Sequence, residues 1–141
     1  MGAALIARVG TLTCAIPIEH VIETMRPLPT EPIGDMPGYV AGLAIIRGEP
    51  TLAIDLAALL GVERGAVTRF VVVRAGGSRR AALAVDAVID VRDVSAHDAL
   101  PPLIRAESIR EIAAADRELV VVLEAARAIA PEVWSALEAR A

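Results

Sequence analysis

GLAIIRGEPTLAIDLAALLG, residues 42–61, decides the fold expected for this chain. Two short apolar runs, Leu43–Ile46 and Thr51–Ile54, flank the turn-forming sequence RGEP and predict a β-hairpin. Gly48 suits a turn position with positive φ, and Pro50 can open the second strand because it has no N–H to donate. Residues 42–54 are therefore expected to form a strand, a charged turn and a second strand.

A short helix is expected directly after this hairpin. Asp55 is a good N-cap for the apolar run Leu56–Leu60, and Gly61 is a good residue to end it. Arg47 is the one strongly charged group that this apolar unit directs outward. The stretch thus predicts a compact β-β-α unit that presents a single guanidinium.

The composition restricts the core and the class of partner. The chain has 141 residues, of which 55% are hydrophobic and 2% aromatic, so its core is expected to consist of Val, Ile, Leu and Ala. This length allows one domain, or two small barrels that share a core. The net charge of −4 gives no indication of nucleic-acid binding, and the basic pair Arg79-Arg80 is expected to be only solvated.

The sequence favours a soluble cytoplasmic protein. Cys14 is the only cysteine, so no internal disulfide is possible, as is usual in a reducing compartment. No apolar run reaches the ~18 residues of a membrane span, and the first residues lack the basic segment of a signal peptide.

Many short strands separated by Gly and Pro are expected along the rest of the chain. They are Ala4–Val9, Thr13–Pro17, Arg69–Arg74, Ala81–Val85, Val88–Val91, Ile109–Ala113 and Leu119–Leu123. A helical turn and a strand are expected within Ile18–Met25, loops at Arg26–Pro37 and Ser95–Ser108, and helices at Glu124–Ile129 and from Pro131. This pattern predicts a mainly β fold, either a barrel or a sandwich.

An internal repeat divides the chain. AIPIEHVIE, residues 15–23, is echoed by ALAVDAVID, residues 82–90, at an offset of 67. Asp55 and the helix after it are echoed by Glu124 and its helix at an offset of 69. Chance similarity in a Val/Ala-rich chain is the alternative, but the matching order favours two copies of one small β unit. The repeat also pairs Glu19 with Asp86, which indicates structural rather than acid–base roles.

No group of residues predicts catalysis, a metal site or a cofactor. Ser95, His97 and Asp98 are the residue types of a hydrolase triad, but close neighbours on one loop rarely reach the required geometry. His20 is expected at or near the surface without a second ligand at metal-binding spacing. Cys14 lies in an apolar run and is expected to be a small core residue.

Four segments in the same order resemble the CheW-like family. In that family a Gly-x-x-Asn-Leu-Arg-Gly segment leads through a strand ending in Asp-Leu to a short helix ending near Leu-Gly, as residues 42–61 do here. CAIPIEHVIETM resembles the first strand–turn–strand segment of the family. RFVVV with ALAVDAVIDV resembles the middle strands, and DRELVVVLEAARAI resembles the final strand and helix.

The resemblance implies a non-catalytic adaptor without a cofactor. The family fold consists of two five-stranded SH3-like barrels around a shared apolar core, with short helices, and residues 1–141 are expected to form one such domain. Family members couple chemoreceptors to a CheA-type histidine kinase through its regulatory domain, in the cytoplasm and clustered with receptor arrays. The positions that match the receptor-binding residues of the family are Val21, Glu23, Gly42 and Arg47.

Several departures from the family pattern leave other functions open. Ile45 stands where the family usually has Asn, Glu111 where glycine is common, and Ala82 and Ala87 replace frequent glycines. One alternative is therefore a divergent member that binds receptors but couples poorly, or not at all, to the kinase. A small hydrolase that uses His97 or Cys14 is the alternative from another class of proteins.

Overall fold

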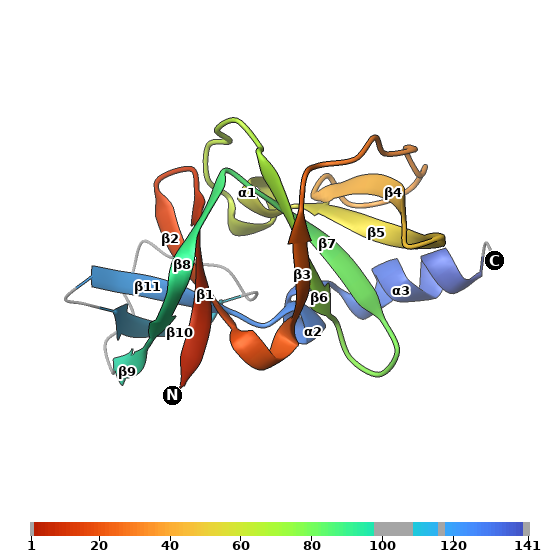
Figure 1. Ribbon diagram of the computed structural model, residues 1–141. Coiled ribbons are helices and arrows are strands. Elements are labelled where there is room, and N and C mark those ends of the chain that lie inside the picture. Colours follow the sequence, from red (N-terminus) through yellow and green to blue (C-terminus); the bar gives the residue numbers. More distant parts are fainter. Residues whose placement is uncertain (1, 98–108, 116–117, 140–141) are drawn as a thin grey trace.

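A computed structural model describes residues 2–97, 109–115 and 118–139, which form two β-sheets and several short helices (Figure 1). The strands are β1 Ala3–Val9, β2 Leu12–Pro17, β3 Val21–Met25, β4 Val40–Ile46, β5 Glu49–Asp55, β6 Arg69–Arg74, β7 Arg80–Val85, β8 Ala87–Asp93, β9 Ser95–His97, β10 Ile109–Ala115 and β11 Glu118–Leu123. The helices are the 3-10 turn η1 Ile18–His20, α1 Leu56–Leu60, α2 Ala125–Ala128 and α3 Pro131–Glu138. This mainly β fold confirms the expected class, and no helix within the described ranges is long and apolar enough to cross a membrane.

The two sheets repeat one topology. The five-stranded sheet has the order β3-β6-β7-β5-β4, and the six-stranded sheet has the order β8-β1-β2-β11-β10-β9. In each sheet one parallel pair, β5 with β7 or β11 with β2, lies among antiparallel neighbours. The chain crosses between the sheets from β2 to β3 and again from β7 to β8, within the two segments that echo each other in sequence. The arrangement of strands thus agrees with a duplication of one β unit.

Several central strands are buried on both faces, so their sequences are continuous apolar runs. Alternate residues of β1, Leu5 and Ala7, join a core shared by the two sheets, whereas Ile6 faces the interior of the six-stranded sheet. The shared core also receives side chains from α1, α2 and α3, such as Leu56, Ala125 and Trp134. Five residues of the strands expected from the sequence, which we expect to form part of the Val/Leu core, are all buried: Val72, Leu83, Val85, Val121 and Leu123.

Small and large apolar residues together fill the interior of the curled five-stranded sheet. Ala44, Ala53 and Ala82 gather there around the single ring of Phe70, and Ile22 of β3 packs against them. Side chains from both edge strands thus meet in one interior, although no hydrogen-bonded ladder joins β3 to β4 among the described residues. In the structure, the two expected five-stranded barrels take the form of two strongly curled sheets. One of these sheets has β9 as a sixth strand.

The β4–β5 hairpin turns more tightly than expected. Ile46 pairs with Glu49, so the turn consists only of Arg47 and Gly48, with φ values of 55° and 79°. Two successive positive φ values match the right-handed twist of the flanking strands in a two-residue turn. The expected four-residue connection is therefore wrong: Glu49 already belongs to β5, and Pro50 pairs with Ile45 inside the hairpin.

Helix α1 has the predicted caps. The Ala58 amide donates to Asp55 Oδ1 at 3.2 Å, and Gly61 ends the helix in the left-handed conformation with φ of 72°. These caps fix where β5 stops and where the chain turns over the shared core.

One expected loop begins as a strand. Ser95–His97 form β9, which pairs antiparallel with residues 112–114 of β10. Pairing with β10 satisfies backbone groups that an unpaired edge would expose, and sequence alone did not indicate it. Residues 98–108, the rest of that expected loop, lie outside the described residues.

Candidate functional site

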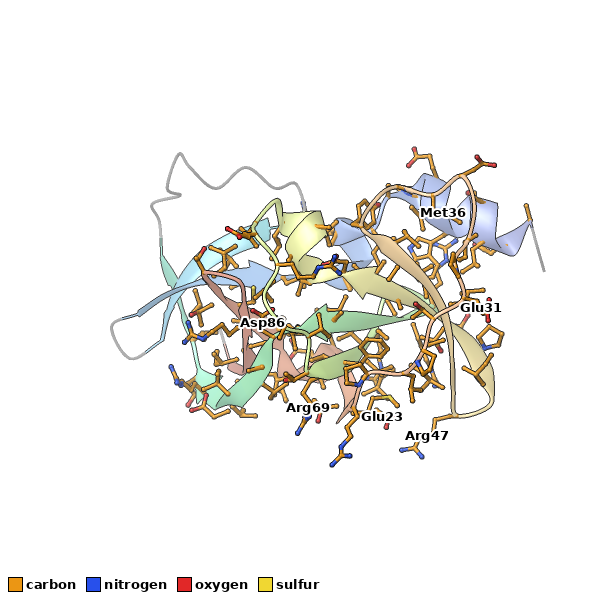
Figure 2. All side chains as sticks on the ribbon, turned by 90° about the horizontal axis from the view of Figure 1, so that it is seen from above. Glu23, Glu31, Met36, Arg47, Arg69 and Asp86 are labelled. Carbon is orange, nitrogen blue, oxygen red and sulfur yellow. The ribbon has the colours of Figure 1, made fainter. Side chains whose placement is uncertain are left out.

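Two of the four predicted site residues form a forked ion pair (Figure 2). Arg47 Nη2 lies 2.8 Å from Glu23 Oε1, and Arg47 Nε lies 3.2 Å from Glu23 Oε2. Glu23 comes from β3, whereas Arg47 lies at the tip of the β4–β5 hairpin. The sequence predicted both residues and an outward-directed guanidinium, but it did not predict the contact of that guanidinium with Glu23.

This pair connects the two edges of the five-stranded sheet. β3 and β4 stand at opposite ends of the strand order, so the guanidinium and carboxylate meet only because the sheet curls. The Arg47 side chain nevertheless remains 75% exposed, against 24% for Glu23. The solvent-accessible position predicted for Arg47 is therefore confirmed, and the carboxylate holds the guanidinium in one orientation.

The ion pair also lowers the pKa of Glu23. The hydrogen bond from Arg47 lowers the pKa of Glu23, and the charges of Arg47 and Arg80 act in the same direction, against the opposing effect of desolvation. The same hydrogen bond raises the pKa of Arg47. Both residues are therefore held in their charged forms.

Gly42 serves the backbone of the adjoining loop. Its φ is 141°, and a Cβ at this position would meet the Glu31 carbonyl. Glu31 and Leu43 exchange backbone hydrogen bonds of 2.8 and 2.9 Å directly beside it. Gly42 is buried and therefore offers no side chain to a partner. Its lack of a Cβ allows the proline-rich loop to lie against β4.

Val21 lies on the same strand as Glu23 but packs inward. It is half-buried, pairs with Val73 of β6 and packs against the shared core. The structure thus brings Glu23 and Arg47 together, while Val21 and Gly42 support the strands and loop around them.

Sequence reasoning missed an apolar groove on the same hairpin. The proline-rich loop and the β4–β5 hairpin enclose about 410 Å³. The groove is lined by Leu28, Pro29, Glu31, Leu43, Ile45 and Pro50. Ile45, with 63% of its surface exposed, projects where the family usually has Asn. That departure was the available signal, but only the folded loop shows that it borders a groove.

Cys14 has the surroundings of a core residue. It is fully buried in the shared core. Burial and, to a lesser extent, the charge of Asp86 raise the pKa of Cys14 to about 12, so the thiol is not ionised at neutral pH. This environment opposes a nucleophilic role.

The remaining residues of the hydrolase hypothesis give it no geometric support. The backbone of Ser95 and His97 lies in β9, and Asp98 lies outside the described residues. His20 is half-buried in η1, as expected. Across the ranges that the structure describes, no three His, Cys, Asp or Glu side chains gather in a cluster that could hold a metal ion.

The comparison with known families agrees with the fold. The model of the CheW-like domain family matches residues 3–132. The chain belongs to the CheW-like domain family. The resemblance inferred from the four sequence segments is therefore confirmed.

Two curated proteins are similar to this chain. Protein FrzA of Myxococcus xanthus is 30% identical over 106 residues, which cover 74% of this chain and 66% of FrzA. Chemotaxis protein CheW of Rhizobium meliloti (strain 1021) is 35% identical over 103 residues, which cover 71% of this chain and 66% of that protein. The matches thus span slightly less than two thirds of each relative's length.

A solved structure shares the fold. The crystal structure of scaffolding protein TtCheW from Thermoanaerobacter tengcongensis superimposes with a TM-score of 0.77, over 86% of this chain and 83% of that one. At 21% sequence identity, this similarity concerns the fold alone.

Proposed function

We propose that this CheW-like domain is a non-catalytic adaptor that couples chemoreceptors to a CheA-type histidine kinase. Family membership supports the proposal, as do the names of two similar proteins, a chemotaxis protein and a scaffolding protein. The observation that carries it is the exposed ion pair of Glu23 and Arg47, at positions that match the family's receptor-binding residues. The adaptor is expected to act in the cytoplasm, at receptor arrays.

The pair is suited to contact a helical receptor tip. Glu23 fixes the guanidinium of Arg47, so less side-chain freedom is lost when a partner binds. A guanidinium has more N–H donors than these two bonds use, and the remaining ones are available to carboxylates or free carbonyl groups of the partner. We infer a charge-assisted contact at the hairpin tip.

The groove beside Ile45 supplies apolar contact area for the same surface. Exposed apolar residues next to a polar group are typical of protein interfaces, in which an apolar centre is surrounded by a polar rim. Gly42 contributes indirectly by holding the loop that forms one wall, and Val21 by supporting β3.

A second function is favoured by Ile45 itself. An isoleucine cannot make the side-chain hydrogen bonds of the usual Asn, so a partner that bonds to that Asn loses this contact. Under this alternative the chain binds receptors but does not couple them to the kinase.

Separate calorimetric titrations distinguish these functions. The full chain is titrated with a chemoreceptor signalling-tip fragment and, independently, with the regulatory domain of the kinase. Binding to both supports the adaptor, and binding to the receptor fragment alone supports the alternative. Binding to neither, by folded protein, would contradict both.

A further inference from the structure

Three arginines gather where the β6–β7 hairpin turns. Arg74 ends β6, Arg80 begins β7, and Arg79 lies in the turn between them. We propose that this hairpin end binds an acidic segment of a partner protein. The three side chains form an exposed basic site, named here the arginine hairpin, on a chain whose net charge is −4. This binding is separate from the proposed receptor contact of Arg47.

The strand register holds two of these charges against each other. Arg74 and Arg80 are direct partners across the antiparallel ladder. Like charges directly opposite one another destabilise a sheet. Among the ion pairs of the described residues, none neutralises Arg74 or Arg80. An anionic group placed between the two guanidiniums would relieve this repulsion, which favours binding.

Other contacts hold the arginine hairpin in position. Arg74 Nη1 donates to the Glu19 carbonyl at 3.0 Å. Arg79 Nη2 lies 2.7 Å from Glu138 Oε1, and its guanidinium carbon lies 5.3 Å from the centre of the Trp134 ring. Arg79 is therefore anchored to α3. The expectation that it is only solvated was wrong. Charged side chains held in this way lose less freedom when a partner binds.

A depression lies among the three arginines. It encloses about 210 Å³ and is lined by Ile22, Arg74, Gly77, Ser78, Arg79 and Arg80. Ile22 adds an apolar contact, and the Ser78 hydroxyl can donate a hydrogen bond. Arginine guanidiniums bind carboxylates through forked, charge-assisted hydrogen bonds. The depression therefore fits one or two Asp or Glu side chains of a short peptide segment.

The overall charge favours a short acidic segment over a large polyanion. A nucleic acid or an anionic membrane would extend beyond the hairpin over a surface that is acidic in total. Ile22 also adjoins Glu23, whose pKa is affected by the charge of Arg80, so the arginine hairpin borders the Glu23–Arg47 surface. A protein already seated on that surface could reach the arginine hairpin with an adjacent acidic segment.

Fluorescence anisotropy with a fluorescein-labelled hexaglutamate peptide tests the proposal at low ionic strength. The double variant Arg74→Gln/Arg80→Gln should weaken peptide binding by about tenfold, because both forked contacts are lost. The control Arg26→Gln/Arg69→Gln removes the same net charge from exposed positions away from the β6–β7 turn, with Arg69 at the far end of β6, and should change affinity by less than about twofold. Salt should weaken binding to the unmodified protein.

A second variant keeps all three arginines. Ser78→Glu places a carboxylate of the chain itself at the depression, and it should compete with the peptide and reduce its binding. This variant also tests the proposal if loss of the Arg74–Glu19 contact unfolds the double variant. Thermal melts of every variant accompany the titrations, and the double variant should melt at or above the temperature of the unmodified protein once the repulsion is removed.

Three results would overturn the proposal. They are the absence of saturable binding, an equal loss of affinity in the control variant, and tighter binding of single-stranded DNA or phosphatidylglycerol vesicles through the same arginines. The peptide measurement does not depend on the receptor and kinase titrations. If those titrations contradict the adaptor function, the peptide measurement still tests the arginine hairpin.

Discussion

At the scale of single residues, the Glu23–Arg47 pair accounts for the candidate site. Both residues could be predicted from their match to family positions, but their contact could not. They are 24 positions apart, on strands at opposite edges of one sheet, and only its curl brings them together. The hairpin was predictable from local turn chemistry, whereas the contact depends on the tertiary shape.

Arg47→Ala should weaken binding of the receptor-tip fragment by about tenfold or more, as is typical of an interface arginine. Arg47→Lys should recover only part of the affinity, because an ammonium cannot reproduce the forked contact. The melting temperature should change little, since the side chain is exposed. Calorimetric titrations and melts of both variants measure these effects, with Arg26→Ala as an exposed control. Unchanged affinity would remove Arg47 from the site.

The protonation of Glu23 provides a test of the pair in the free protein. In the Arg47→Ala variant the pKa of Glu23 should rise toward its ordinary value, because its main hydrogen-bond donor is gone. In the unmodified protein the folded-state pKa lies below the unfolded one. The pair therefore stabilises the fold above the unfolded-state pKa, and this contribution is lost as the pH falls through the folded-state pKa. Carboxyl NMR titration of both proteins measures the shift, and identical pKa values would show that the pair does not form.

At the scale of elements, the proline-rich loop depends on one glycine. The sequence marked Gly42 as a matching position but could not separate a binding role from a backbone requirement. The φ of 141° and the closeness of the Glu31 carbonyl indicate that glycine is required here by the backbone conformation. The groove was not predictable either, because four prolines in a loop indicate irregular structure without showing which strand it covers.

Gly42→Ala should destabilise the protein by about 1–3 kcal/mol, because a residue with a Cβ is strained at this φ and would push the loop from β4. Gly48→Ala is the matched control: its φ of 79° is also positive, but a Cβ there meets open space. The control should therefore cost only about 1–2 kcal/mol of backbone strain. Urea unfolding of both variants gives the comparison. A Gly42 variant as stable as the Gly48 variant would argue against the loop contact.

At the scale of the whole molecule, the repeat and the apolar patterning predicted the architecture well. Two copies of one β unit imply two similar sheets, and Val/Ile/Leu/Ala runs imply strands buried on both faces, as observed for β1. The pattern could not show which positions of the curled interior hold small residues. Ala82, where the family often has glycine, lies fully buried in such an interior beside Phe70 and Val72.

Ala82→Leu should destabilise the protein by about 1–3 kcal/mol although it adds only apolar atoms, because the interior is already filled. Ala41→Leu, at an exposed position of β4, should have little effect on unfolding. Calorimetric melts of the two variants would show the difference. A neutral or stabilising Ala82→Leu would mean that the five-stranded interior holds unfilled space.

Bridging of a chemoreceptor and a kinase by this chain is tested most directly by co-purification. Immobilised receptor signalling tip is mixed with the kinase regulatory domain, with or without this chain. The adaptor function predicts that the regulatory domain is retained only when the chain is present, and that the Arg47→Ala variant retains much less of it. Retention that is equal with and without the folded chain, or no retention in either case, would contradict the claim.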